Sequence, residues 1–350
     1  MNQNLHKFHS IRFQNIQALR AVLAIFVVLE HVRFAACGAF GVDGFFAISG
    51  FMILFSTANS TEHFFKKRLI RILPLYYFMT LGTFLLLLVA PDMFETTSAD
   101  MGSLVKSLLF IPFDIGGGVL QPLMRVGWTI NCEIFFYFLF WLSFKISHKY
   151  RAVICSVLLI LPVVLSHTLS HSSAMLTFYG APVMLDFIWG MVAYYVCRWV
   201  YVKWNEKLTT LSSSALSLLR IAFLIATTAS FALLIATKPN INTLTWQRPL
   251  IWGGVGFLLV LIFFIIELCG IKAPQAAIQL GNASFSLYLL HYYPVMLLDR
   301  MVFHFEHLTL FSLTGVCFAI AVSVILALLS HEWVEKRFSD RLKNRLIKSS

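Results

Sequence analysis

Residues 20–51 of the chain read RAVLAIFVVLEHVRFAACGAFGVDGFFAISGF, two apolar runs joined by a short turn. Each run approaches the roughly 20 residues with which a helix crosses a bilayer core of about 30 Å. We therefore expect membrane-spanning helices at 16–36 and 41–57. A tight turn at Cys37–Gly41 folds the second helix back along the first.

The composition of the whole chain is that of a membrane protein. Apolar residues make up 59% of the 350 residues and charged residues 12%, whereas soluble domains carry roughly 25% charged residues. The formal charge is +11, but the basic residues form short groups between apolar runs. Nucleic-acid binding would need a continuous basic stripe, so we expect no nucleic-acid partner.

Span length and hydropathy predict an all-α polytopic membrane protein with about ten transmembrane helices. Residues 1–335 would form this transmembrane domain, and residues 336–350 a basic cytoplasmic tail that either binds anionic membrane lipid or serves as a topology anchor. The predicted spans are 16–36, 41–57, 74–90, 130–147, 152–168, 178–197, 214–236, 246–268, 278–298 and 309–330.

The distribution of lysine and arginine predicts the orientation. With ten spans, most of the 27 basic residues fall on the side that holds both termini, so we expect both termini to be cytoplasmic. Arg20 and Arg220 lie inside spans. The basic residues on the other side are Arg33, Lys106, Arg125, Lys238, Arg248 and Arg300.

The first span contains Arg20, Glu30 and His31, and ionisable groups within a span are functional candidates because they are costly there. Arg20 and His31 are eleven residues apart, which is three helical turns plus about 20°, so both project from one face about 16 Å apart along the axis. This face could hold a long ligand with an anionic head, with His31 as a general base at its reactive tip. The alternative is an arginine that reaches the headgroups and a histidine bonded to a neighbour.

Asp43 opens the second span at about the depth of His31. A carboxylate there could hold the imidazole of His31 in one tautomer, or it could cap the second helix. Gly44 and Gly50 would allow close approach of neighbouring helices.

Residues 63–74 predict an amphipathic helix on the inner surface, with Pro74 at the start of the third span. Arg68 and Arg71 are i, i+3 neighbours on one face of it. Two guanidinium groups at this spacing match the oxygens of a phosphate; the alternative is simple positive-inside charge.

Two later spans carry further polar groups. Glu133 lies inside the apolar fourth span and needs a partner or a wet cavity. Tyr288 and His291 are i, i+3 neighbours in the ninth span and could line an acceptor pocket or pack as satisfied core residues. Metal binding is not expected, because the pairs His167/His171 and His304/His307 lack a neighbouring carboxylate or cysteine.

Five segments together resemble the acyltransferase 3 family of membrane O-acyltransferases, which modify bacterial surface glycans. The resemblance spans roughly residues 14–300 and is closest to the exopolysaccharide-production acetyltransferases of the family. The segments are Arg20 with His31, residues 41–51 (GVDGFFAISGF), residues 68–76 (RLIRILPLY), residues 128–137 (WTINCEIFFY) and residues 286–291 (SLYLLH).

The resemblance implies a multi-pass protein of the bacterial inner membrane that moves an acyl group from cytosolic acetyl-CoA, a co-substrate, to a hydroxyl of a surface or exported polysaccharide or its lipid-linked precursor. Polysaccharide-synthesis proteins are further expected partners. The residues that the resemblance brings to the site are His31, Asp43 and Glu133 for catalysis, Arg20, Arg68 and Arg71 for acyl-CoA, and Trp128, Asn131, Tyr288 and His291 for the acceptor.

Two alternatives stay open at this point. Direct attack of the hydroxyl on the thioester competes with an acyl-enzyme relay through Ser49 or His31. A transporter or flippase for a polysaccharide intermediate would use the same intramembrane charges as a polar pathway, and broken spans would favour it. A scaffold for a polysaccharide synthase would leave Arg20 and His31 unexplained.

Overall fold

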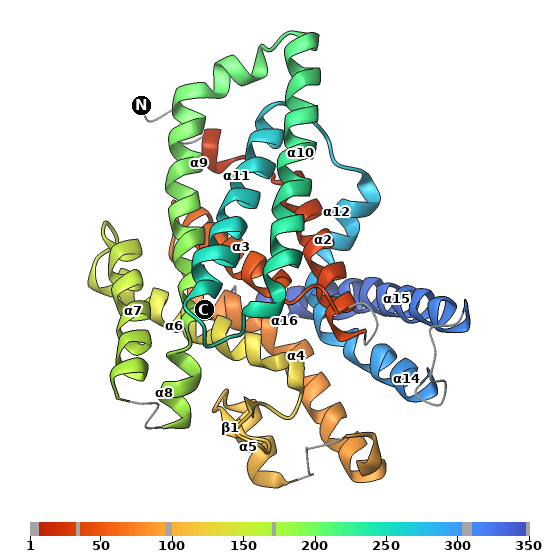
Figure 1. Cartoon of the computed structure of the whole chain (residues 1–350). Coiled ribbons are helices and arrows are strands. Elements are labelled where there is room, and N and C mark those ends of the chain that lie inside the picture. The colour runs from red at the N-terminus through yellow and green to blue at the C-terminus, as the bar shows by residue number, and fades with distance from the viewer. Residues whose placement is uncertain (1–6, 33–35, 95–99, 170–172, 303–309, 348–350) are drawn as a thin grey trace. The chain divides into compact units, whose positions relative to one another are not determined.

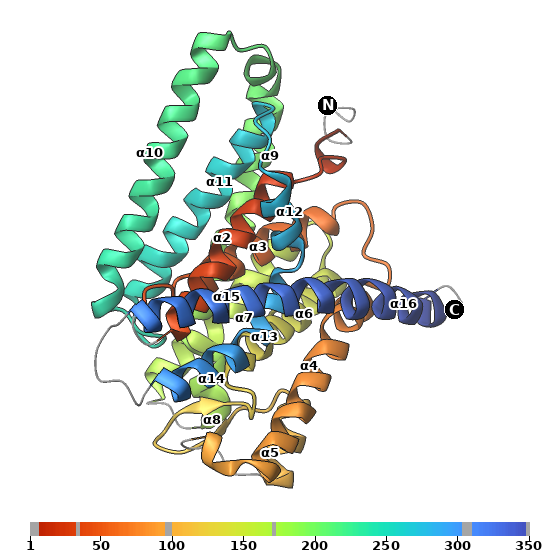
Figure 2. The ribbon, with the colours of Figure 1, turned by 90° about the vertical axis from the view of Figure 1, so that its right-hand side faces the viewer.

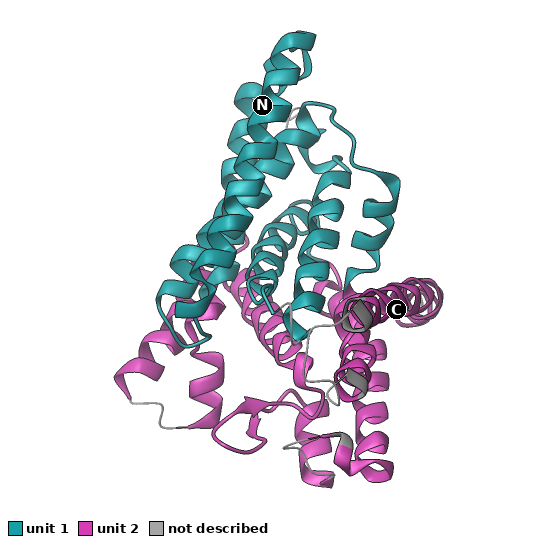
Figure 3. Cartoon of the chain, turned by 45° about the vertical axis from the view of Figure 1, so that its right-hand side comes forward, with its two compact units in different colours: residues 1–61, 185–284 teal, residues 62–184, 285–350 magenta. Residues whose placement is uncertain are grey.

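The computed structural model describes residues 7–32, 36–94, 100–169, 173–302 and 310–347, which are helical along most of their length (Figure 1). The chain divides into two compact units (Figure 3). Unit 1 combines residues 1–61 with 185–284, and unit 2 combines residues 62–184 with 285–350.

Unit 1 contains the predicted first pair of helices and the helices of the middle of the chain. Figures 1 and 2 show α9, α10 and α11 running side by side. The helices are α2 (Gln14–His31), α3 (Gly41–Ser56), α9 (Asp186–Thr209), α10 (Ser213–Thr237), η4 (Lys238–Asn240), the π-helix η5 (Pro249–Gly253), α11 (Gly254–Leu268) and α12 (Gln275–Asn282).

Glycines set the closest helix contact in unit 1. A Cβ atom on Gly50 of α3 would lie 2.1 Å from the carbonyl oxygen of Phe187, and one on Gly190 of α9 would lie 2.0 Å from that of Ala47. The two backbones therefore touch where both residues lack a side chain, as small residues allow at helix interfaces in membranes. The expected close approach at Gly50 is confirmed, and Gly44 similarly lies against the side chain of Leu23 in α2.

Unit 2 contains the longest of the described α-helices, α4 with 26 residues, and a short β-hairpin. In the hairpin, Phe113 pairs with Gln121 and Asp114 with Leu120. The elements are α4 (Phe64–Val89), η1 (Pro91–Met93), α5 (Met101–Leu108), β1 (Phe113–Asp114), β2 (Leu120–Gln121), η2 (Arg125–Gly127), α6 (Trp128–Ile146), α7 (Arg151–Thr168), α8 (Ala174–Tyr179), η3 (Pro182–Leu185, whose last residue belongs to unit 1), α13 (Ser284–Leu290, whose first residue belongs to unit 1), α14 (Tyr292–Val302), α15 (Leu310–Ser330), the π-helix η6 (His331–Phe338) and α16 (Ser339–Ile347).

The prediction of a separate surface helix ending at Pro74 is wrong. Helix α4 continues through Pro74 from Phe64 to Val89. Proline has no N–H, so the carbonyl of Ile70 loses its partner within the helix. The hydroxyl of Ser339 in α16 donates a hydrogen bond to this carbonyl at 3.3 Å, and a tertiary contact thus replaces the helical one.

Among the described residues, seven helical segments are long and apolar enough to cross a membrane. Helices α2 and α3 are not among them, because α3 has 16 residues and α2 carries polar residues near both ends. The seven are Phe64–Val89, Arg125–Ile146, Arg151–Thr168, Pro182–Thr209, Ser213–Asn240, Pro249–Leu268 and Thr314–Ile347. The chain is a multi-pass membrane protein, whereas the count of ten spans and the side of the termini stay predictions.

One predicted span in the last hundred residues differs from the helices that the structure forms. The predicted span at 278–298 is divided among α12, α13 and α14, with interruptions at Ala283 and His291. The segment expected as a tail at 336–350 continues, as far as residue 347, the uninterrupted helical run of α15, η6 and α16 (Figure 2).

Candidate active site

His31 is the last residue of α2 and is half-buried. Its Nδ1 lies 2.9 Å from the carbonyl oxygen of Val27, one turn earlier. A carbonyl only accepts hydrogen bonds, so Nδ1 carries the proton and the neutral ring has its lone pair on Nε2. This tautomer is the one that a general base acting through Nε2 requires.

Arg20 lies on the same uninterrupted helix. The helix geometry assumed from the sequence therefore holds, and the two side chains leave one face about 16 Å apart along the axis. Arg20 donates to the side-chain oxygen of Gln17 at 3.2 Å. The helix thus carries a cation in its first half and an imidazole at its end.

The expected partnership of Asp43 with His31 needs correction. Both carboxylate oxygens of Asp43 accept hydrogen bonds from Arg248, from Nε and Nη2 at 2.9 Å each. Nδ1 of His31 instead makes its hydrogen bond with the Val27 carbonyl. The physical reason is that Asp43 is fully buried, and a buried carboxylate is satisfied better by a two-pronged guanidinium than by one imidazole N–H.

Arg248 is the residue that sequence reasoning missed most clearly. The charge distribution counted it only as a basic residue of the outer side, yet it is only 4% exposed and its guanidinium lies 5.0 Å from the ring centre of Trp252. The sequence indicated only that Asp43, a carboxylate within a predicted span, needs a cationic partner. Nothing in the spacing of the chain singles out Arg248 from the other basic residues.

A second buried carboxyl, Asp186, starts α9 near this ion pair and interacts electrostatically with Asp43 and Arg248. It is fully buried, and its side chain lies within hydrogen-bonding reach of the Asp43 carboxyl, with which it can share a proton. A Cβ on Gly253 would lie 2.3 Å from one of these oxygens, so the carboxyl occupies the space that glycine leaves.

Glu30 holds the turn that follows His31. Its Oε2 accepts from the backbone N–H groups of Gly38 and Ala39 at 2.8 and 3.1 Å and pairs with Lys238 at 2.8 Å. Burial raises the pKa of the Cys37 thiol in the same turn, and the nearby Glu30 carboxylate raises it further. The thiol therefore stays protonated at neutral pH and is not a thiolate nucleophile.

In unit 2, a tyrosine links two of the predicted site residues. The Tyr137 hydroxyl donates to Glu133, one turn earlier in α6. The guanidinium of Arg68 lies 5.3 Å from the centre of the Tyr137 ring and 5.7 Å from that of Phe64. Arg71, one turn along α4, is exposed. The structure thus brings Arg68 and Glu133 to one cluster around Tyr137.

The predicted acceptor residues of unit 2 have different surroundings. The Tyr288 hydroxyl donates to the carbonyl of Val126 at 2.9 Å and accepts from Thr129 at 2.7 Å, which ties α13 to the start of α6 beside the half-buried Trp128. His291 is fully buried, and its Nδ1 donates to the carbonyl of Leu287 at 3.0 Å.

Among the predicted acceptor residues, Asn131 has the most unusual surroundings. Its side chain is fully buried, and neither the amide nitrogen nor the amide oxygen has a hydrogen-bond partner among the described residues. Leaving such groups unpaired costs about 1–3 kcal/mol each. Within the part of the chain that the structure describes, the amide is thus a donor and an acceptor without a partner.

Glu335 is a second residue that sequence reasoning missed. Its carboxylate accepts from the backbone N–H and the hydroxyl of Ser286 at 3.0 and 2.5 Å, and pairs with His331 at 3.2 Å. The serine of the SLYLLH segment is therefore held by a carboxylate in the π-helix η6. The indication in the sequence was that Glu335 is an acidic residue within a basic segment.

Metal ligands were not expected from the histidine pairs. His171, His304 and His307 lie outside the described residues. Among the residues described, no group of three or more histidine, cysteine, aspartate or glutamate side chains could hold a metal ion.

Comparison with known proteins adds independent information. A family model described as "Acyltransferase domain" matches residues 13–329. The chain is also similar to the exopolysaccharide production protein ExoZ of Rhizobium meliloti (strain 1021), with 27% identity over 75% of this chain and 78% of that protein. No solved structure matches. The family match covers the segments quoted above and most of the chain, so the chain belongs to the acyltransferase 3 family and is an acyltransferase.

Proposed function

We propose that this protein is an inner-membrane O-acetyltransferase that moves an acetyl group from cytosolic acetyl-CoA to a hydroxyl of an exported polysaccharide or its lipid-linked precursor, with His31 as general base. The observation that carries the proposal is the hydrogen bond from Nδ1 of His31 to the Val27 carbonyl. It gives Nε2 the lone pair that removes a proton from the acceptor.

The chemical step follows from this tautomer. Nε2 takes the proton of the sugar hydroxyl while the hydroxyl oxygen bonds to the carbonyl carbon of the thioester. The carbon–sulfur bond then breaks, and the CoA sulfur leaves with the electron pair. The imidazolium returns its proton to that sulfur, which regenerates the neutral base. Direct transfer of this kind needs no acyl-enzyme, whereas a relay through Ser49 or His31 would form one.

Arginine side chains are the proposed contacts of the donor. The phosphates of CoA suit Arg20, Arg68 and Arg71, because forked guanidinium donors match phosphate oxygens. Support comes from the exposure of Arg71 and from the line of Arg20 and His31 along one helix. In this proposal the arginines hold the head of the donor and His31 acts at its thioester.

Asn131 is our candidate for stabilising the oxyanion that forms during transfer. An N–H donor aimed at the developing charge lowers the barrier most when it needs no reorganisation. Support comes from the buried amide of Asn131, whose N–H group has no hydrogen-bond partner among the described residues. Trp128 and His291 remain proposed acceptor contacts, and Glu133 a proposed catalytic residue. Tyr288 is reassigned to holding the start of α6, because its hydroxyl already makes two hydrogen bonds.

The Asp43–Arg248 pair takes a positioning role in this proposal. It ties the start of α3 to the segment before η5 and thereby supports the turn that Glu30 holds after His31. Asp43 then acts on the catalytic histidine through the backbone and not through its Nδ1 atom.

The acceptor is proposed from the relative. ExoZ is named for exopolysaccharide production, and its similarity extends over three quarters of this chain. The preference for acetyl, the inner-membrane location and the cytoplasmic termini come from the family resemblance and from the positive-inside distribution of charge.

The test compares two histidine variants. His167 of α7 makes the same bond as His31, from Nδ1 to the carbonyl four residues earlier, at 3.0 Å. We expect His31→Ala to lower acetyl transfer by about a hundredfold or more and His167→Ala to leave it unchanged. Acetate bound to the surface polysaccharide is measured for equal amounts of inserted protein. Normal acetylation by the inserted His31→Ala protein would contradict the proposal.

One observation favours the transporter alternative. Interrupted helices are typical of transport sites in membranes, and the segment 278–298 is interrupted at Ala283 and His291. A transporter would translocate a lipid-linked glycan in vesicles without acetyl-CoA. An acetyltransferase would release CoA only when the acceptor is present, so the two assays distinguish the functions.

A further inference from the structure

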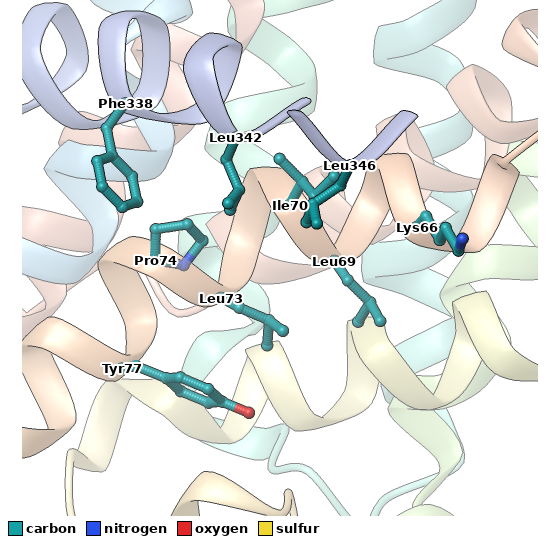
Figure 4. Close-up of a pocket in the computed structure, with 9 residues that line it drawn as sticks. All are labelled: Lys66, Leu69, Ile70, Leu73, Pro74, Tyr77, Phe338, Leu342 and Leu346. Carbon is teal, nitrogen blue, oxygen red and sulfur yellow. The ribbon is translucent and has the colours of Figure 1, made fainter. Parts of the chain in front are cut away.

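An apolar groove in unit 2 separates the first half of α4 from α16 (Figure 4). Its volume is about 450 Å³, within the range of small-molecule sites. We call it the α4–α16 groove. The lining residues used below are Lys66, Leu69, Leu73 and Tyr77 of α4 and Leu342 and Leu346 of α16.

The two walls of the groove are joined by a hydroxyl that is shared between the Ile70 carbonyl, at 3.3 Å, and the Val334 carbonyl, at 3.2 Å. Pro74 leaves the Ile70 carbonyl without a helical partner, and Ser339 at the start of α16 donates to that carbonyl. Ser339 is only 8% exposed. From this contact α16 runs along α4, and the groove lies between the two helices.

The wall formed by α16 is the apolar face of an amphipathic helix. Leu342 and Leu346 are four residues apart and continue from Phe338, so the three share one face (Figure 4). Phe338 and Leu346 are each about half exposed, at 52% and 51%. The remaining faces carry Arg341, Lys343 and Arg345. An apolar stripe beside basic residues is typical of helices at the surface of anionic membranes.

Charge marks one end of the groove. Lys66 is its only charged lining residue among those described and lies beside Leu346, at the opposite end from Phe338 (Figure 4). An elongated apolar channel with an ammonium at one end complements a hydrocarbon chain that ends in an anionic head.

We propose that the α4–α16 groove binds an anionic glycerophospholipid, with one acyl chain along the leucines and the phosphate at Lys66. The site is separate from the proposed acetyl transfer, because its lining includes none of the residues assigned to that reaction. It gives the basic C-terminal helix a specific lipid in place of a general attraction to the membrane.

The test uses the full chain in phosphatidylcholine vesicles that contain a phosphatidylglycerol with a photoreactive diazirine in its acyl chain. After irradiation, labelled peptides are identified by mass spectrometry. We expect label on residues 69–77 and 342–346. Phosphatidylcholine with the same diazirine should label these residues less.

Two matched pairs of variants locate the site. Lys66→Glu should lower labelling about fivefold or more, whereas Lys67→Glu, the same charge change at a residue outside the groove whose ammonium bonds to the Glu62 carbonyl, should not. Leu342→Trp should fill the groove and abolish the label, and Lys343→Trp should retain it. All variants are compared at equal insertion.

Three outcomes would overturn the proposal. Equal losses of labelling in Lys66→Glu and Lys67→Glu would show that general surface charge attracts the lipid. Equal labelling by phosphatidylcholine would show that the groove does not select an anionic headgroup. Label outside the two predicted peptides would place the lipid elsewhere. Labelling does not depend on acetyl transfer, so none of these outcomes bears on the proposed reaction.

Discussion

Arg248 donates two hydrogen bonds of 2.9 Å to the carboxylate of Asp43, across 205 residues of chain. Both side chains are buried, and the guanidinium also lies over the ring of Trp252. This pair joins α3 to the segment before η5 inside unit 1.

The Asp43–Arg248 pair predicts strong coupling between two variants. Arg248→Gln or Asp43→Asn alone should lower the free energy of unfolding by about 3–5 kcal/mol, because each leaves a buried charge unpaired. The double variant should lose much less than the sum of the two. Unfolding of the purified protein in detergent measures all three. Additive losses would mean that the two residues act independently.

Asn131→Ala should separate activity from stability. The proposed oxyanion contact predicts that kcat falls about 10²–10³-fold. Stability should stay equal or rise, because the variant removes a buried amide that has no partner among the described residues. Acetyl-transfer kinetics and thermal unfolding are measured on the same preparation. A normal kcat would remove Asn131 from the reaction.

Arg71 should contribute to donor binding and not to chemistry. Arg71→Gln is expected to raise the KM for acetyl-CoA about tenfold with little change in kcat, because one charge-assisted contact to phosphate is lost. Lys67→Gln removes a neighbouring exposed charge of the same helix and serves as the control. Steady-state kinetics with varied acetyl-CoA distinguish the two, and an equal rise in KM would indicate general electrostatic attraction only.

Gly50→Ala should weaken the contact of α3 with α9. Its Cβ would lie 2.1 Å from the Phe187 carbonyl, and such overpacking costs typically about 1–3 kcal/mol. Gly82→Ala in α4 is the matched control, because nothing lies within 4 Å of the added carbon. Thermal unfolding in detergent should show a loss at position 50 and none at position 82.

Pro74 and Ser339 should be coupled through the Ile70 carbonyl. Ser339→Ala should destabilise the protein by about 1–3 kcal/mol by leaving this buried carbonyl unpaired. In a Pro74→Ala background, the restored N–H can bond to the same carbonyl, so the effect of Ser339→Ala should largely disappear. The four proteins of this cycle are compared by unfolding, and an unchanged effect of Ser339→Ala would contradict the coupling.

Local patterns in the sequence were sufficient for the helical membrane class and for the line from Arg20 to His31. A continuous helix repeats every 3.6 residues, so the face shared by two of its residues follows from their spacing alone. The apolar runs likewise predicted the membrane class, and the ordered motifs predicted the family. Each of these properties depends on neighbours along the chain.

Only the tertiary structure decided the partners of the charges and the continuity of two helices. Arg248 and Glu335 pair with residues 205 and 49 positions away, and such pairings depend on packing that no local period encodes. The same holds for α4, which continues through Pro74 with its freed Ile70 carbonyl bonded by Ser339, and for the interruption at His291. The sequence by itself determined the kind of protein and the helix that carries Arg20 and His31, and tertiary packing decided which side chains pair around that helix.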